Sequence, residues 1–317
     1  PYVNFALDAR DRLSLNALYS NLTYEKSPET SNIYSGGAQV SHLISSASSI
    51  ALVANARYTE LSGEGGFTEA STDTYNIRSA YLQYTSAIAR TKLSAAIGYT
   101  SLDFGSDKTS TPYVSMQLDR RISYDSTVYL RASNGYSNTG QYLQDNFGST
   151  PSEVSGPTGE SLGVATQNPF KESMGAVGYR FDRDRTAFSL TLSTIAQRYE
   201  AVTGFNQNRY VLSSELERQL SPTMSANISA QVNRVHFESA DAGFTDVMAS
   251  AGVTKHFRRA SLIIRYDRYQ RAGNGSLPLA VQTSTPGPAG EPPPVSLNDN
   301  RIGVYVSYDV LGHKQRL

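Results

Sequence analysis

A strict alternation of apolar and polar residues constrains this chain more than any other feature. In the stretch Met224–Asn233, every even-numbered residue is apolar and every odd-numbered residue is polar. Successive side chains of a β-strand point to opposite faces, so this stretch predicts a strand with one apolar and one polar face. Ser221-Pro222-Thr223 precedes it as a tight turn, and Arg209–Leu220 predicts the partner strand of a hairpin.

The rest of the chain repeats this hairpin. Short turns are expected near residues 11, 47, 88, 123, 184, 221 and 258, most of them about 35 to 41 residues apart. Each repeat holds two strands of roughly 10 to 14 residues, and a tilted membrane strand needs about 9–11. All the long polar connections fall at the ends opposite the short turns, as transmembrane barrels show.

The composition excludes several classes of protein. The 28 Lys and Arg residues balance 28 Asp and Glu residues, whereas a nucleic acid partner requires a basic excess. There is no Cys, so disulfides, thiol nucleophiles and cysteine metal sites are excluded. The sequence contains no apolar run of about 18 residues, which excludes a transmembrane helix but not membrane strands.

The predicted fold class is therefore all-β, a transmembrane antiparallel up-and-down β-barrel of about 16 strands. About 15 strands are visible, and bacterial barrels have even numbers, so the first is expected before Pro1 or in a misread segment. We expect one outer-membrane barrel domain over 1–317, with long outer loops near 137–171 and 273–298. A β-helix, a β-sandwich or a lipocalin-like barrel fits less well, because about 15 long strands enclose a lumen too wide for side chains to fill.

The last strand is similar to the β-signal of bacterial outer-membrane proteins. Arg301, Gly303, Val306 and Tyr308 fill its polar, glycine and two hydrophobic positions, although the usual final aromatic residue is absent and Asp309–Leu317 follows. Four turn segments end one strand with a charged residue and begin the next with alternating Ser or Thr: DARDRLSLNALY, FDRDRTAFSLTL, LDRRISYDSTVYL and LERQLSPTMSANI. In this pattern the whole chain resembles a family of outer-membrane β-barrel porins linked to exopolysaccharide secretion. The resemblance implies a barrel in the bacterial outer membrane that serves polysaccharide export.

Alternation also predicts which residues line the lumen. Tyrosines on the apolar faces are expected at the membrane interfaces instead: Tyr58, Tyr99, Tyr179, Tyr266 and Tyr308. Any wide pore is lined by polar residues to stay wet, so no single lining residue implies a specific role. The lumen candidates are Arg57, Asp119, Arg121, Tyr129, Arg131, Glu215, Glu217, Arg265, Asp267, Tyr269 and Tyr305.

Catalysis is not expected. None of His42, His236, His256 and His313 lies in a metal-spacing motif, and His236 is at most a lone candidate base. We therefore expect no enzyme activity, cofactor or metal. Our leading hypothesis is a pore through which a hydrophilic polymer, an exopolysaccharide, crosses the outer membrane. The alternatives are a passive porin for small polar solutes and a non-conducting scaffold for a periplasmic or surface protein. Expected partners are outer-membrane lipid, the assembly machinery, polysaccharide and periplasmic export proteins, but not nucleic acid.

Overall fold

The computed structural model describes residues 2–23, 30–62, 74–105, 107–137, 169–200, 204, 206–238, 242–274 and 297–308. Fifteen β-strands make up its regular structure in these ranges. The strands are β1 (Tyr2–Ala6), β2 (Asp11–Thr23), β3 (Thr30–Ser45), β4 (Ser48–Ser62), β5 (Thr74–Ile88), β6 (Thr91–Phe104), β7 (Asp107–Arg121), β8 (Ser126–Ser137), β9 (Phe170–Arg183), β10 (Thr186–Tyr199), β11 (Gln207–Ser221), β12 (Met224–Phe237), β13 (Ala242–His256), β14 (Ala260–Asn274) and β15 (Leu297–Tyr308).

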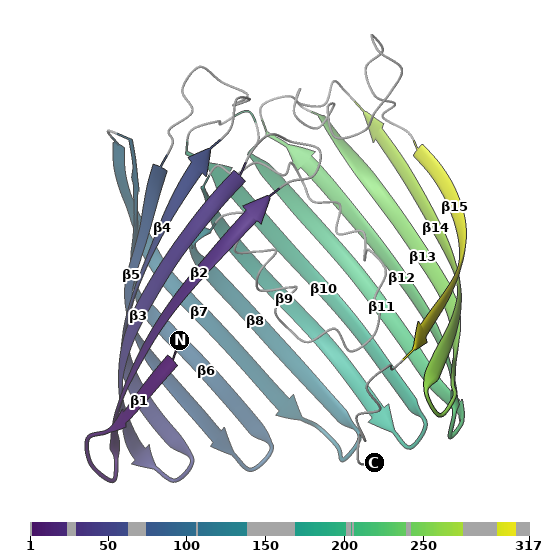
Figure 1. The fold of residues 1–317 in the computed structure, drawn as a ribbon, viewed down its shortest axis with the longest axis horizontal. Helices are drawn as coiled ribbons and strands as arrows, with labels where there is room; N and C mark the ends of the chain where they lie inside the picture. Colours follow the sequence, from purple (N-terminus) through teal and green to yellow (C-terminus); the bar gives the residue numbers. More distant parts are fainter. Residues whose placement is uncertain are drawn as a thin grey trace.

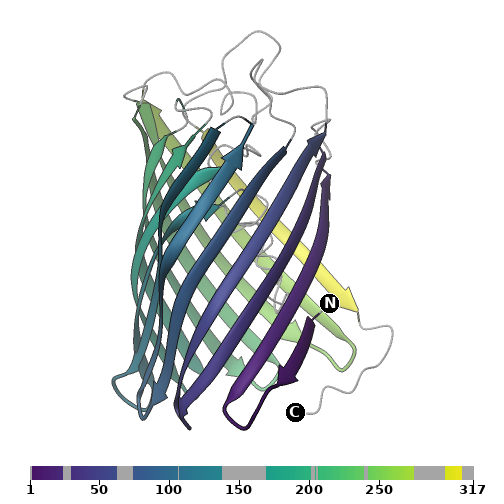
Figure 2. The same ribbon diagram turned by 90° about the vertical axis from the view of Figure 1, so that its left-hand side faces the viewer.

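The strands form one antiparallel sheet whose order follows the chain from β1 to β15. Figures 1 and 2 show the strands tilted and curved around a common axis, with short turns gathered at one end. The predicted fold class is confirmed as an all-β, up-and-down barrel architecture. β1 and β15 run in the same direction, because alternate strands of the sheet do, and no pairing between them occurs among the described residues.

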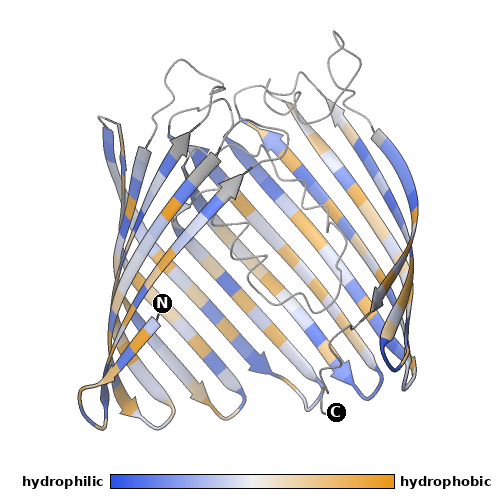
Figure 3. Cartoon of the chain, in the orientation of Figure 1, coloured by the Kyte–Doolittle hydropathy of each residue, from blue (hydrophilic) through white to orange (hydrophobic). Residues whose placement is uncertain are grey.

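The predicted alternation decides which face of the sheet is apolar, and the two kinds of residue alternate along the strands in Figure 3. On β12, Ile228 is 57% exposed on the apolar face. The register places Leu52 beside Leu82 and Leu82 beside Ile97, so the exposed apolar side chains join into a band across strands. A band of this kind matches the lipid-facing surface of a membrane barrel.

Short turns connect the strands at the end here called the turn end, and the opposite end is called the loop end. At the turn end, β5 joins β6 through Ala89-Arg90 and β9 joins β10 through Asp184-Arg185. Ala89 and Asp184 have positive φ angles of 49° and 51°. Two-residue hairpins favour turns with positive φ, because their twist matches that of the strands.

Within the ranges given above, the chain forms no helix with the length and hydropathy needed to cross a membrane. The two long inserts predicted at 137–171 and 273–298 fall mainly on 138–168 and 275–296. Those stretches lie outside the described residues, so their expected role as outer loops stays a prediction.

Candidate functional site

The polar faces of neighbouring strands line up into one surface, called the inner face here. The register pairs Asp119 with Tyr129, Tyr129 with Gly178 and Gly178 with Thr191, and paired residues of antiparallel strands share a side. By the same register, all eleven residues predicted to line a lumen lie on this face. They are Arg57 on β4, Asp119 and Arg121 on β7, Tyr129 and Arg131 on β8, Glu215 and Glu217 on β11, Arg265, Asp267 and Tyr269 on β14, and Tyr305 on β15. Their contact with a transported solute stays a prediction.

Charges on the inner face are partly neutralised within single strands. On β14, the Nε of Arg265 lies 2.6 Å from Oδ1 of Asp267, two residues along the same strand. On β15, the Nε of Arg301 lies 2.5 Å from Oδ2 of Asp299. Residues two apart share a face, so such pairs are local. The inner face therefore carries charges of both signs without a strong field of one sign.

Tyr129 lies flat against the inner face because the neighbouring strand has a glycine below it. A Cβ built at Gly178 would lie 2.1 Å from Cζ of Tyr129, so only glycine leaves room for the ring. The hydroxyl of Tyr129 is hydrogen-bonded to that of Thr191 on the strand beyond. The guanidinium of Arg131 lies 5.0 Å from the ring centroid. The ring is thus held parallel to the wall by contacts on two sides.

A stacked aromatic pair on the inner face comes from β5 and β7. Tyr81 and Tyr113 flank Gly98 on the intervening strand β6. Their ring centroids are 4.5 Å apart with an interplanar angle of 25°. On β15, a Cβ at Gly303 would lie 2.5 Å from Cε2 of Tyr305. Glycine next to tyrosine is therefore a repeated device of the inner face.

Toward the loop end, the side chains of the inner face are buried. Phe237 is 0% exposed, and its ring lies 6.1 Å from that of Phe244. Alternation predicts the side to which a residue points but not whether water reaches it there. Other buried apolar residues toward this end of the strands are Tyr75, Ile77, Leu102, Tyr136, Phe170, Tyr199, Val235 and Ala242.

A buried charged cluster lies on the inner face of β13 and β14. Asp246 is 0% exposed and accepts hydrogen bonds from the Tyr269 hydroxyl at 2.7 Å and from Nε and Nη2 of Arg271 at 2.7 and 3.1 Å. The Arg271 guanidinium also stacks over Phe244, 4.1 Å from the ring centroid. Sequence reasoning singled out Tyr269 but missed Asp246 and Arg271. The signal was available, since Phe244 and Asp246 continue one alternating face.

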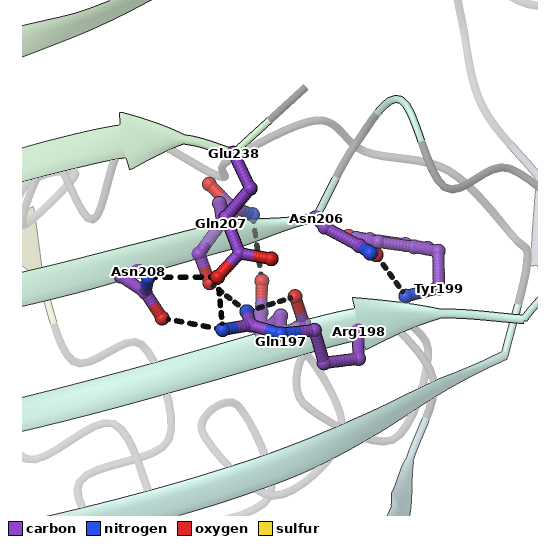
Figure 4. Close-up of polar contacts among 7 residues, drawn as sticks. All are labelled: Gln197, Arg198, Tyr199, Asn206, Gln207, Asn208 and Glu238. Atoms are coloured by element: carbon purple, nitrogen blue, oxygen red, sulfur yellow. Dashed lines mark hydrogen bonds and ion pairs between the residues drawn. The ribbon is translucent and has the colours of Figure 1, made fainter. Parts of the chain in front are cut away.

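A polar network ties together the loop ends of β10, β11 and β12 (Figure 4). Nη1 of Arg198 donates to the backbone carbonyls of Gln197 and Gln207, both at 3.0 Å. Its Nη2 donates to Oδ1 of Asn208 at 2.9 Å and to Oε1 of Glu238 at 2.5 Å. This arginine therefore fixes the backbones that carry two buried inner-face glutamines, Gln197 and Gln207.

The predicted assembly signal lies on β15. Arg301, Gly303, Val306 and Tyr308 all fall within Leu297–Tyr308, which pairs only with β14 among the described strands. Val306 is exposed on the apolar face. A role of these residues in assembly stays a prediction.

The histidines do not gather around a common centre. His42 Nδ1 lies 2.7 Å from Oδ1 of Asp11, and His256 Nδ1 lies 2.9 Å from the Ser261 hydroxyl, both near the turn end. His236 is exposed beside Asn208 at the loop end, and His313 lies outside the described residues. Over the ranges given for the fold, no three His, Asp or Glu residues are grouped to hold a metal ion.

Three solved structures share this architecture. The FrpB iron transporter from Neisseria meningitidis has a TM-score of 0.61 at 11% identity, over 98% of this chain and 56% of that chain. The copper transporter OprC has a TM-score of 0.53 at 12% identity, over 95% and 54%. The ferric citrate transporter FecA in its unliganded form has a TM-score of 0.50 at 11% identity, over 84% and 48%. No protein-family model and no curated protein matches the sequence.

These likenesses concern the fold. The chain spans about half the length of the solved structures that it matches, and the identities are near one residue in nine. The neighbours are bacterial outer-membrane β-barrels. Together with the exposed apolar band, they support the predicted outer-membrane location.

Proposed function

We propose that this chain forms a passage for a hydrophilic polymer, an exopolysaccharide, across the outer membrane. A partner assembly supplies the driving force, and the chain makes and breaks no covalent bond. The observation that carries this proposal is the set of tyrosine rings beside glycines on the inner face. Tyr129 lies over Gly178, and Tyr81 and Tyr113 stack on each other on either side of Gly98. Flat aromatic surfaces among hydroxyl and amide groups suit the apolar faces and hydroxyl rims of sugars.

The charge arrangement agrees with a bulky polar cargo. Inner-face arginines and aspartates pair within one strand, as at Arg265–Asp267 and Arg301–Asp299. Such pairs keep the surface hydrated without attracting ions of one sign over long distances. A passive porin for small polar solutes would need the same wet surface, so this feature alone favours neither pore.

One observation favours a non-conducting scaffold instead. The inner face is buried toward the loop end, at Phe237 and Asp246 among others. An inner face that is covered at one end suits a barrel that does not conduct, as a scaffold would be. The structural neighbours are named for copper, iron and ferric citrate, and at 11–12% identity those cargoes remain theirs.

Conductance of the full chain in a planar bilayer separates these candidates. A steady, weakly ion-selective conductance is expected for a pore, and silence after verified insertion would reject both pore functions in favour of the scaffold. In the producing bacterium, loss of polymer export on deletion of the gene, with small-solute uptake unchanged, is expected for the polymer passage. Lost uptake with unchanged export would indicate the passive porin.

Matched tyrosine variants test the flat rings directly. Tyr129→Ala removes an inner ring, whereas Tyr99→Ala removes a ring that is exposed on the apolar face. Residence of a neutral oligosaccharide such as maltohexaose in the conducting channel is expected to shorten several-fold in the first variant and to stay unchanged in the second. Equal residence in both would remove the main support for a sugar passage.

A further inference from the structure

Arg209 is a buried cation without a counter-charge. Its side chain on the inner face of β11 is 4% exposed, and its Nε has no hydrogen-bond partner. No ion pair to Arg209 occurs within the part of the chain that the structure describes. Directly opposite on the two adjacent strands are Ile195 and Val235, which offer no carboxylate. A buried charge is costly unless it is paired and hydrogen-bonded, so this position calls for an anion.

Other inner-face arginines show what is missing at Arg209. Arg265 and Arg301 each have an aspartate two residues away on the same strand, at 2.6 and 2.5 Å. Arg271 has the buried Asp246 at 2.7 Å. The residues two positions from Arg209 are Gln207 and Val211. β11 therefore has a neutral amide, Gln207, two residues from its arginine, whereas β14 and β15 have an aspartate at that spacing.

That amide is fixed with its oxygen unpaired. The Nε2 of Gln197 donates to Oε2 of Glu172 at 3.0 Å, and a carboxylate can only accept. The Oε1 of Gln197 therefore accepts from Nε2 of Gln207 at 2.7 Å (Figure 4). The Oε1 of Gln207, whose residue is 0% exposed, is left with no partner. The unpaired amide oxygen of Gln207, which can accept a hydrogen bond, is thus two residues from the unpaired guanidinium of Arg209, which can bind an anion.

We propose that Gln207 and Arg209 form a binding site for a sugar acid. A carboxylate of the ligand pairs with the Arg209 guanidinium, and a hydroxyl of the same ligand donates to Oε1 of Gln207. Uronic acids carry both groups on one ring. This inference rests on the proposed polymer passage and names its cargo class as an acidic polysaccharide.

Binding of an acidic oligosaccharide to the full chain in detergent micelles tests the site by calorimetry. The probes are oligogalacturonate, the neutral maltohexaose and inorganic sulfate. Wild-type protein is expected to bind oligogalacturonate more tightly than either of the others. Arg209→Gln should weaken that binding at least tenfold, and Arg209→Lys should weaken it less. Arg234→Gln is the matched control, because Arg234 is exposed on the opposite face of β12, and it should bind as the wild type does.

A second variant tests the unpaired charge through folding. Val211→Asp places a carboxylate two residues after Arg209 on the inner face, as Asp267 stands two residues after Arg265, and it leaves the hydrogen bond between Gln207 and Gln197 in place. It is expected to raise the thermal unfolding midpoint and to abolish oligogalacturonate binding. A midpoint that falls would show that Arg209 is already satisfied and would overturn the site, even if Arg209→Gln failed to fold.

Other outcomes reject the inference in distinct ways. Equal binding of oligogalacturonate by Arg209→Gln and wild type would reject the role of Arg209. Sulfate that binds as tightly as oligogalacturonate would leave an anion site only and reject the sugar acid. Because calorimetry needs no conduction, a silent bilayer would reject the pore while these binding results still judge the site.

Discussion

The two halves of the inner face obey the same alternation but have different surroundings. Toward the turn end, Glu215 on β11 is exposed, and toward the loop end of the same strand Gln207 and Arg209 are buried. The inner-face residues of β11 are mostly polar both in the buried part of the strand and in the exposed part. The comparison teaches that alternation predicts the direction of a side chain, whereas its distance along the strand decides whether it meets water.

The largest contrast is expected between two aspartates on the inner face. Asp246→Ala removes the partner of a buried guanidinium and leaves Arg271 uncompensated, which should cost about 3–5 kcal/mol of unfolding free energy. Asp267→Ala breaks the pair with Arg265, in which the aspartate is 34% exposed, and should cost less, about 1 kcal/mol. Urea titration of the protein in micelles measures both. Similar losses would show that the two regions do not differ in burial.

Halfway along β12, charges on opposite faces separate direction from depth. Ile228→Arg puts a charge on the exposed apolar face and should cost about 2–4 kcal/mol if that position is near the bilayer midplane. Ser229→Arg puts it on the inner face, where Ser229 bonds Ser250, and should cost less. Folding yield in lipid vesicles reports both. If the two variants fold equally well, the assignment of inner and outer faces is wrong.

Two inner-face glycines offer a finer test of how tightly the wall is packed. Gly98→Ala would set a Cβ 2.1 Å from the backbone oxygen of Ala80, so the strands must separate, at about 1–3 kcal/mol. Gly178→Ala meets only the outer end of the Tyr129 ring, which can swing away, so a smaller loss is expected. Thermal unfolding compares them. A larger loss for Gly178→Ala would mean that the flat ring matters more than the wall behind it.

The smallest effect is expected at the outer side of the loop end. Glu238→Gln weakens the ion pair with Arg198. The Glu238 side chain is 41% exposed and that of Arg198 is 35% exposed, so the loss should be about 0–1 kcal/mol of unfolding free energy. The loss should shrink further in high salt, because screening weakens exposed pairs. A loss as large as that of Asp246→Ala would erase the distinction between buried and exposed pairs at this end.

The sequence predicts the hairpin repeat, the short turns and the face of each candidate residue, because all three follow from a period of two and from local turn chemistry. It does not reveal the buried loop end. The inner face of β12 changes from polar at Asn233 to apolar at Val235 and Phe237. The sequence of β12 alone does not explain this change, because Phe237 is buried against Phe244 of the neighbouring strand β13. The Asp246–Arg271 pair joins two strands, so it depends on a register that no single strand specifies.

The order of the sheet has a consequence for the rate of folding. Every pairing joins strands that are consecutive in the chain, so each step closes one hairpin, and low contact order favours fast folding. Two of these consecutive pairings close much longer connections than the others: 138–169 separates β8 from β9, and 275–296 separates β14 from β15. Each doubling of a flexible loop adds about 0.6 kcal/mol of closure entropy. We therefore expect β1–β8 and β9–β14 to form first as two separate sheets. The pairings of β8 with β9 and of β14 with β15 are expected to form last.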